Sequence, residues 1–346
     1  MKIDLIFNAA VLREIGKYPS ICKVKFSGSL YVKQVLVRIL VSGICGKQIE
    51  EYKGHFGRDN YLPHMLGHEA VGIVESIGPE VDDLEVGDKV VMHWLDAYTD
   101  NITPLPEYYS GSEKINAGYL TTLAEYCITR SNKLTKIPND SDPSKLYLLG
   151  CGLTTGLGSV LNEANVQPGD KCLIVGLGGV GLSVAMGINL LNSSVFDILD
   201  INHEACMLAS FYKPRFSYNS LSDLIQSVNT YNKIFYCIGN GLIFADIYTL
   251  LEPQGLMIMV GVPNTETIVN LPLLSIHRRK MLTGSHGGSI APRTDIPYYA
   301  RKICDNSLNI APLVGRMFPL CDIEDAFYCA EFNTGRTRVQ CSTYQN

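Results

Sequence analysis

The sequence predicts an α/β protein of two domains, the first built mainly of strands and the second around a parallel sheet. Three observations support this. Short apolar segments separated by glycine turns fill most of the first 150 residues. Near Leu149 the order of elements changes to strand, helix, strand. A chain of 346 residues also exceeds one typical domain.

Valine, isoleucine and leucine dominate the segment from Leu30 to Ser42, which predicts a strand leading into a turn at Cys45. Two more apolar strands are expected within residues 67–78 and 86–91. Such strands favour an all-β, partly barrel-like first region. Residues 95–118 are polar and rich in turn formers, so we expect a long loop or lobe there.

The second region begins with a buried strand at residues 172–175, an apolar helix at 182–191 and a strand at 195–202. This β-α-β unit predicts a parallel sheet, because parallel strands need a crossover connection. Three further strands are expected. They lie at residues 234–240, 255–261 and 281–285. We expect the second of them, at 255–261, to lie at the edge of the sheet and to pair subunits there.

Composition excludes several classes of protein. The net charge of −5 and the lack of a long basic block argue against a nucleic-acid partner. The N-terminus lacks the features of a signal peptide, and no run of about 18 apolar residues predicts a membrane span. The eleven cysteines are scattered without a disulfide framework, so we expect free thiols and a cytoplasmic protein.

A glycine motif, GxGxxG, occupies Gly176, Gly178 and Gly181 between the first strand of the second region and its helix. There the glycines permit a tight turn and close approach of a pyrophosphate to the helix N-terminus. Asp200 ends the next strand, 19 positions after Gly181. A carboxylate there would accept ribose hydroxyls and repel a 2′-phosphate, so NAD is favoured over NADP. The alternative is an ordinary glycine turn beside a surface aspartate.

Three residues suggest a metal site: Cys45, His68 and Cys151. Two thiolates and one imidazole form a Cys₂His set that leaves one zinc position open for water or substrate. Such an open position is typical of a catalytic zinc.

Together these motifs resemble the zinc-dependent medium-chain alcohol and polyol dehydrogenases over nearly the whole chain. The residues that carry the resemblance are Cys45-Gly46, Gly67-His68-Glu69-Ala70, Val86-Gly87-Asp88-Lys89-Val90, Gly150-Cys151-Gly152 and the glycine motif. The resemblance implies a catalytic domain based on a distorted, GroES-like β-barrel, formed by residues 1–152 and 286–346. A Rossmann domain, residues 153–285, is inserted between them.

The resemblance also implies roles. Cys45, His68 and Cys151 would be the zinc ligands, and Glu69 an acidic residue near the zinc that assists ligand exchange. The implied cofactor contacts are Thr155, Gly176, Gly178, Gly179, Val180, Gly181, Asp200, Ile201 and Arg338. Trp94 and Leu123 correspond to walls of the substrate pocket, although core packing at a barrel rim is the plainer interpretation of Trp94. In this family zinc acts as a Lewis acid on the substrate oxygen and the nicotinamide takes up a hydride.

Three departures from the family pattern matter. No cysteine lies between His93 and Leu120, where the family holds a structural zinc, so we expect one catalytic zinc per chain and no structural zinc. The family usually has Ser or Thr, then Asp, where this chain has Lys47 and Gln48. The late basic residue near the pyrophosphate is displaced by about one position, so either Arg336 or Arg338 could serve.

Lys47 has three interpretations. It could accept the alcohol proton if burial and the nearby cation lower its pKa. It could bind an acidic group of the substrate. It could also extend into solvent while water carries the proton.

The sequence therefore predicts an NAD-dependent zinc oxidoreductase that acts on an alcohol, more specifically a polar secondary alcohol, a polyol or a sugar derivative. An aldehyde or ketone reductase of the same family is the alternative, and an inactive binding protein that keeps the fold is a further one. The expected partner is a small alcohol or carbonyl compound. A homodimer or homotetramer is also expected.

Overall fold

The computed structural model describes residues 2–97, 103–191, 195–333 and 335–342. The chain forms two compact units. Unit 1 comprises Met1–Cys151, Ala291–Ile310 and Val314–Asn346, and unit 2 comprises Gly152–Ile290 and Ala311–Leu313. The functional division of the chain into residues 1–152, 153–285 and 286–346 stays a prediction.

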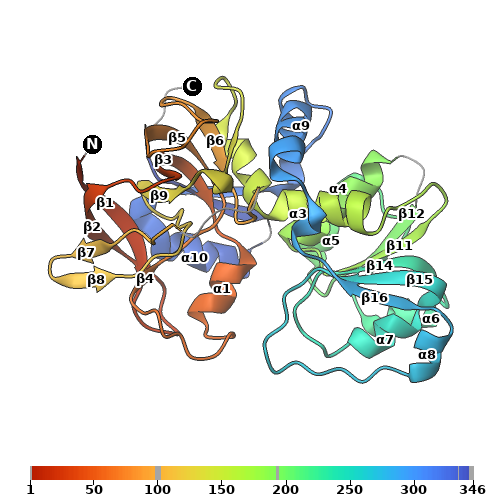
Figure 1. Cartoon of the computed structure of the whole chain (residues 1–346). Coiled ribbons are helices and arrows are strands. Elements are labelled where there is room, and N and C mark those ends of the chain that lie inside the picture. The colour runs from red at the N-terminus through yellow and green to blue at the C-terminus, as the bar shows by residue number, and fades with distance from the viewer. Residues whose placement is uncertain (1, 98–102, 192–194, 334, 343–346) are drawn as a thin grey trace. The chain divides into compact units, whose positions relative to one another are not determined.

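Unit 1 contains two sheets, of which the first is antiparallel (Figure 1). Its strand order is β4-β1-β2-β7-β8. The strands are β1 (Lys2–Leu12), β2 (Ser20–Ser29), β4 (His64–Met65), β7 (Tyr108–Ser110) and β8 (Glu113–Ile115). The short strands β7 and β8 form a hairpin within residues 95–118, where the sequence predicts a loop or lobe.

The second sheet joins segments from both ends of the chain, in the order β10-β6-β5-β3-β18-β17 with β9 also paired to β3. Its strands are β3 (Gln34–Gly43), β5 (Ala70–Ile77), β6 (Lys89–Met92), β9 (Tyr126–Arg130), β10 (Leu134–Lys136), β17 (Val314–Pro319) and β18 (Arg336–Gln340). Nine of the ten residues of β3 are buried, as expected for a central strand. The pairing of β18 with β3 brings the end of the chain beside the segment that leads to Cys45.

One apolar core lies between these sheets and includes Phe7, Val24, Ile39, Val74 and Phe327. The α-helices in the described part of unit 1 are α1 (Gly46–Tyr52), α2 (Pro143–Leu146), α9 (Pro292–Cys304) and α10 (Ile323–Phe332). Helix α10 contributes Ile323, Ala326 and Phe327 to the core.

Unit 2 is built on a six-stranded sheet with the order β13-β12-β11-β14-β15-β16, in which every pairing is parallel. The strands are β11 (Lys171–Val175), β12 (Val195–Leu199), β13 (Ser217–Tyr218), β14 (Tyr231–Tyr236), β15 (Leu251–Met259) and β16 (Met281–Gly284). In chain order this is the 3-2-1-4-5-6 arrangement of a doubly wound nucleotide-binding fold. The predicted α/β class with a parallel sheet is therefore confirmed.

The helices of unit 2 flank its sheet on both faces (Figure 1). They are α3 (Gly152–Gly158), α4 (Gly179–Leu190), α5 (His203–Ala209), α6 (Leu221–Gln226), α7 (Phe244–Thr249) and α8 (Leu273–His277). Helix α4 is buried along most of its length, because it packs against α3 as well as the sheet.

One expectation about this sheet is wrong. The strand expected at its edge, residues 255–261, belongs to β15, which pairs with β14 on one side and β16 on the other. The edge strand on this side of the sheet is β16, and all four of its residues are exposed. Within the described residues, no helix is long and apolar enough to cross a membrane.

Candidate metal and nucleotide sites

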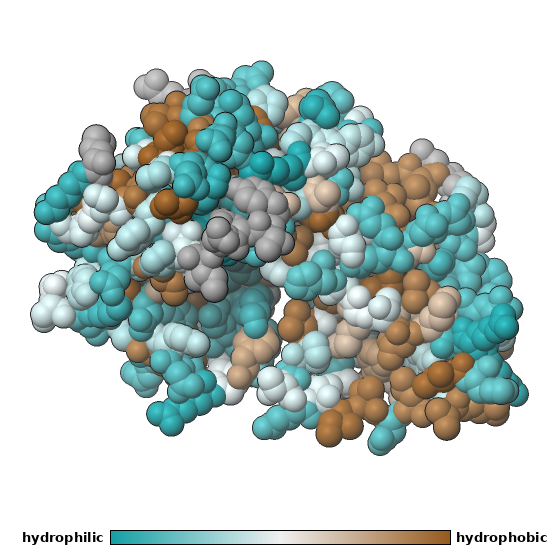
Figure 2. Space-filling view, in the orientation of Figure 1, coloured by the Kyte–Doolittle hydropathy of each residue, from teal (hydrophilic) through white to brown (hydrophobic). Residues whose placement is uncertain are grey.

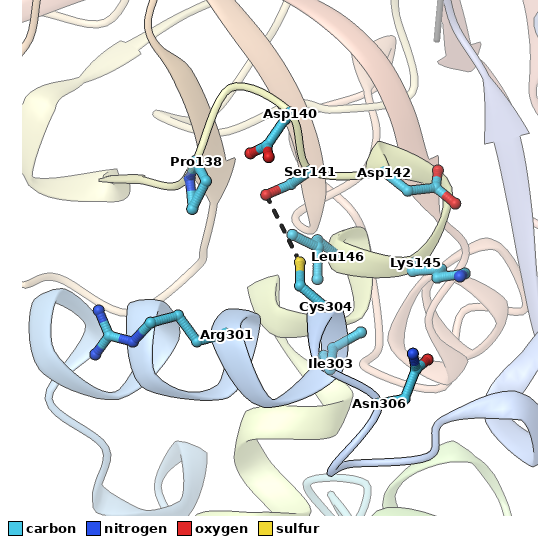
Figure 3. Close-up of a pocket in the computed structure, with 10 residues that line it drawn as sticks. All are labelled: Pro138, Asp140, Ser141, Asp142, Lys145, Leu146, Arg301, Ile303, Cys304 and Asn306. Carbon is cyan, nitrogen blue, oxygen red and sulfur yellow. Dashed lines mark hydrogen bonds between the residues drawn. The ribbon is translucent and has the colours of Figure 1, made fainter.

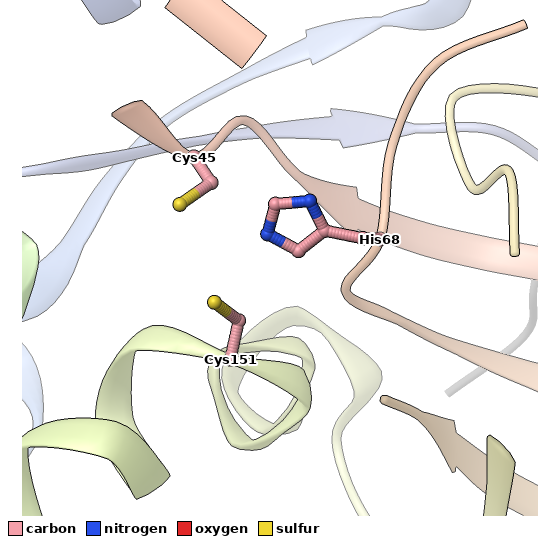
Figure 4. Close-up of side chains that lie close together, drawn as sticks. All are labelled: Cys45, His68 and Cys151. Atoms are coloured by element: carbon pink, nitrogen blue, oxygen red, sulfur yellow. The ribbon is translucent and has the colours of Figure 1, made fainter. Parts of the chain in front are cut away.

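Cys45, His68 and Cys151 lie together in unit 1, and their potential ligand atoms are all within 4.8 Å of one another. The two sulfur atoms and one ring nitrogen of His68 face a common point (Figure 4). The residues come from three segments: the start of α1, the connection between β4 and β5, and the turn before α3. Two thiols and an imidazole at this spacing fit zinc, whose tetrahedral sites use this donor set.

Two glycines beside the ligands allow these segments to approach. Gly67 has a φ of +101°, and a Cβ there would lie 2.5 Å from Thr122 Oγ1. A Cβ on Gly150 would lie 2.4 Å from the carbonyl oxygen of Met92 and 2.8 Å from Glu69 Cα. Any side chain at either position would therefore push a ligand residue away from the site.

The protonation of the two cysteines is linked. The hydrogen bond from the Cys151 thiol lowers the pKa of Cys45 well below its usual value, and the nearby charge of Arg336 lowers it further. The same hydrogen bond, together with burial, raises the pKa of Cys151. A metal ion bound to both sulfur atoms would displace the proton of this hydrogen bond.

Glu69 and Arg336 form a buried ion pair directly behind the ligands. Glu69 Oε1 lies 3.5 Å from Arg336 Nη1, and the two side chains are 0% and 7% exposed. Burial disfavours the charge on Arg336, but the negative charges of Cys45, Glu69 and Cys151 outweigh it and raise the pKa of the guanidinium. Tyr147 donates a hydrogen bond of 2.9 Å to the backbone carbonyl of Arg336 and fixes this end of β18.

The late arginines thus differ in their surroundings. Arg338 is half-buried, and its Nη1 donates a hydrogen bond of 2.7 Å to the carbonyl oxygen of Ser144 in α2. Arg336 lies behind the metal ligands. The place of Arg336 there was not foreseen, because a strand pattern does not identify the partner of a buried arginine.

The two residues that depart from the family pattern lie on α1 with different environments. Gln48 is 2% exposed and contacts both ligand segments. Lys47 is exposed, and its Nζ lies 2.9 Å from the centroid of the Phe56 ring. Desolvation lowers the pKa of Lys47, although the charges of Glu51, Cys45 and Glu50 oppose this shift.

The glycine motif of unit 2 forms the turn between β11 and α4. Gly176 has a φ of +89°, and a Cβ there would lie 2.4 Å from Ile238 Cγ2. A Cβ on Gly181 would lie 1.9 Å from the carbonyl oxygen of Gly176. Around Gly178, the N-cap of α4, the space for a Cβ is open. The turn therefore leaves the N-terminus of α4 approachable on the side of Gly178, while Gly179 and Val180 are half-buried.

Asp200 connects this turn to the end of β12. Its Oδ2 accepts a hydrogen bond of 2.6 Å from the backbone of Leu177, and its Oδ1 accepts one of 2.8 Å from the backbone of Asn202. The neighbouring Ile201 is 90% exposed. The carboxylate thus lies beside the glycine turn and holds its backbone.

The remaining predicted residues occupy different settings. Thr155 lies on α3 in unit 2 and is half-buried. Trp94 lies in unit 1, also half-buried, and its carbonyl oxygen accepts a hydrogen bond from Lys133. Leu123 is fully buried in the core of unit 1. The substrate roles of Trp94 and Leu123 stay predictions.

A separate pocket of about 470 Å³ in unit 1 shares no residue with the metal ligands (Figure 3). The Cys304 thiol lies within it, 3.9 Å from Ser141 Oγ. The charged ends of Arg301 and Lys145 point away from its centre. We assign this pocket no part in the metal site.

Comparison with known proteins places these sites in context. A family model described as the alcohol dehydrogenase GroES-like domain matches residues 32–139. The chain is 25% identical to an S-(hydroxymethyl)glutathione dehydrogenase from Paracoccus denitrificans, over 92% of this chain and 95% of that protein.

Solved structures of other proteins share the fold, and two of them illustrate it. One is an alcohol dehydrogenase zinc-binding domain protein from Burkholderia ambifaria, with a TM-score of 0.89, 22% identity, and 99% of this chain and 100% of that one covered. The other is the benzyl alcohol dehydrogenase of Acinetobacter calcoaceticus, with a TM-score of 0.87, 23% identity, and coverage of 98% and 100%. At these identities the likeness shows the two-domain fold, a GroES-like domain with a nucleotide-binding domain.

Proposed function

We propose that the chain is a zinc-dependent oxidoreductase of the medium-chain alcohol dehydrogenase family that transfers a hydride between an alcohol and NAD. The convergence of Cys45, His68 and Cys151 is the observation that supports the proposal most directly. The proposed substrate is a polar secondary alcohol, a polyol or a sugar derivative.

In this proposal Cys45, His68 and Cys151 hold one zinc ion, which when bound supplies Lewis acidity to the substrate oxygen. Arg336 offsets the negative charge of two thiolates and Glu69, so that both cysteines can stay deprotonated in a buried site. Glu69 keeps its carboxylate beside the ligands because Arg336 pairs with it. Glu69 would then be available to assist exchange of a ligand.

The proposed cofactor residues belong to unit 2, except Arg338, which belongs to unit 1. The N-terminus of α4 would hold the pyrophosphate through the backbone of Gly178, Gly179 and Val180. Asp200 would accept hydrogen bonds from the ribose hydroxyls, which favours NAD. Bound NAD would accept the hydride. Thr155, Ile201 and Arg338 stay proposed contacts on the strength of the family resemblance.

Two alternatives use the same residues. Reduction of an aldehyde or ketone needs the same metal and cofactor in the reverse direction. The other alternative is a binding protein that keeps the fold but has no turnover. It is supported by Lys47 and Gln48, which replace the family's usual residues. The eleven free cysteines support a reducing compartment such as the cytoplasm.

The proposal predicts one zinc per chain, because the described residues contain one cluster of three potential ligands and no cysteine lies between His93 and Leu120. Elemental analysis of purified protein should give about one zinc per chain, and Cys151→Ser should lose zinc and most NAD-linked activity while it stays folded by circular dichroism. Cys304→Ser, an exposed thiol far along the chain, is the matched control and should keep both. Two zinc ions per chain would contradict the prediction.

The substrate class is tested with a panel of polyols, sugar alcohols and primary alcohols, measured by NADH absorbance. Reduction of the matching carbonyl compounds with NADH tests the reverse direction. Zinc-loaded protein that binds NADH but turns over no member of either panel would favour the inactive binding protein.

A further inference from the structure

The Gln48 side chain links the two ligand-bearing segments of the proposed zinc site. Its Oε1 accepts a hydrogen bond of 2.9 Å from the backbone N–H of Cys45. Its Nε2 lies 2.6 Å from Nδ1 of His68. Since Gln48 is 2% exposed, bulk water cannot replace either contact.

This arrangement fixes where the His68 ring can carry its proton. The amide nitrogen is a donor, so Nδ1 must accept, and the single proton of a neutral ring then resides on Nε2. Nδ1 is engaged by Gln48, so Nε2 is the nitrogen left to face the two sulfur atoms (Figure 4). A nitrogen that binds a metal needs a free lone pair, so metal binding through Nε2 requires the proton on Nδ1.

A bound metal therefore creates a contact between two donors. With the proton on Nδ1, the ring N–H points at the amide NH₂ of Gln48. If the amide oxygen and nitrogen of Gln48 exchange positions, Oε1 can accept from the His68 ring. The NH₂ group then faces the backbone N–H of Cys45, which is also a donor. The Gln48 amide has a single acceptor oxygen, but with metal bound both of its neighbours, the backbone of Cys45 and the ring of His68, are donors. Protonation of both ring nitrogens would create the same conflict.

We propose that Gln48 is a positioning residue that holds His68 in the tautomer opposed to metal binding, so that zinc loading costs one buried hydrogen bond. This inference rests on the proposed zinc function. Its consequence is a site that binds zinc less tightly than its three ligands alone would allow. A carboxylate of the same shape would accept from both donors and would remove the conflict.

Gln48→Glu tests this directly, because the two side chains have the same length and shape. Competition with a chromogenic chelator should show zinc bound about 10- to 100-fold more tightly than in the wild type, the range typical for partners of metal ligands. Gly46→Asp is the matched control for charge. It places a carboxylate on the same helix, where the space around the Cβ is open, without contact to His68. Its effect should stay within about threefold, as expected for a solvated charge.

NMR of protein labelled with ¹⁵N-histidine gives a second measurement on the wild type alone. The metal-free ring should carry its proton on Nε2, and zinc loading should move it to Nδ1. A metal-free ring with its proton already on Nδ1 would overturn the proposal, even if Gln48→Glu does not fold.

The two proposals fail in different ways. Wild-type protein that takes up no zinc would refute the zinc function itself. Wild-type protein that binds zinc as tightly as Gln48→Glu would refute the role of Gln48 and leave the function intact.

Discussion

Arg336 lies among three acidic groups of the metal site: Cys45, Glu69 and Cys151. A buried arginine without counter-charges would be strongly destabilising, and so would Glu69 without the arginine. The pairing of Arg336 with Glu69 therefore stabilises the fold of unit 1. It also stabilises the negative charge of Glu69 beside a site that would hold a cation.

Kinetic measurements can distinguish the three interpretations of Lys47. The lowered pKa means that its neutral form, which can accept a proton, is populated at lower pH than in free lysine. If Lys47 accepts the proton, the rate should rise with pH through this pKa, and Lys47→Ala should cut turnover by roughly 100-fold and remove the rise. Measuring kcat and KM across pH tests this.

If Lys47 instead binds an acidic group of the substrate, Lys47→Ala should mainly raise KM, and only for charged substrates. Lys53→Ala is the control, because Lys53 lies at the other end of α1 and pairs with Glu331. Kinetics of Lys47→Ala that match those of Lys53→Ala would return Lys47 to the solvent-exposed interpretation.

At the scale of single residues, the sequence predicted which residues form the candidate metal site, but it did not predict which side chains contact them. Cys45, His68 and Cys151 are identified by local motifs, and the structure brings them together. The bridging position of Gln48 depends on His68, which lies 20 positions away, and on the packing of two segments. The partners of Arg336 depend on the pairing of β18 with β3. Neither relation leaves a local pattern in the sequence.

The turn between β11 and α4 is the element in which sequence and structure correspond most closely. A strand, a glycine motif and a helix follow within 20 residues. Gly176 and Gly181 leave no room for a Cβ, whereas the space around Gly178 is open. The edge of the sheet was predicted wrongly, because the apolar character of β15 suits an interior strand as well as an edge paired to another subunit.

Asp200 at the end of β12 should determine the choice of cofactor. Asp200→Ala should weaken NAD binding about tenfold, the scale of a lost hydrogen bond to a charged group, and should bring NAD and NADP affinities closer together. Fluorescence titration with NADH and NADPH measures both constants. Asp246→Ala, at an exposed position on α7, is the control.

The ratio of the NADH affinity to the NADPH affinity tests the role of Asp200. Asp200 also holds the backbone of Leu177, so loosening of the turn would weaken both cofactors together. Equal affinity for NADH and NADPH in the wild type would contradict the assigned role of Asp200.

At the scale of the whole molecule, unit 2 carries an exposed apolar surface. We call it the edge patch, and it consists of Leu273, Leu274, Ile276, Met281 and Leu282, each at least 42% exposed. Apolar residues gather around α8 in Figure 2. An exposed edge strand with such residues is prone to pair with another chain.

We expect a dimer in which β16 pairs with the same strand of a second copy. Light scattering at micromolar concentration should show at least a dimer. Leu282→Lys should shift the protein toward monomer, because it places a charge on the edge strand, whereas Ile225→Lys on α6 should not. A wild-type protein that is monomeric under these conditions would contradict this expectation.

The pairing of β18 with β3 also has a consequence for the order of events during synthesis. Unit 2 is almost continuous in sequence, so it can fold as soon as its residues have left the ribosome. Unit 1 must wait for the residues from Ala291 onward, and until β18 arrives residues 41–43 of β3 lack their partner on one side and Glu69 lacks its cation. Under the proposed function, zinc uptake would be a late event for the nascent chain, and a chain terminated before β18 would contain all of unit 2 but an incomplete candidate metal site.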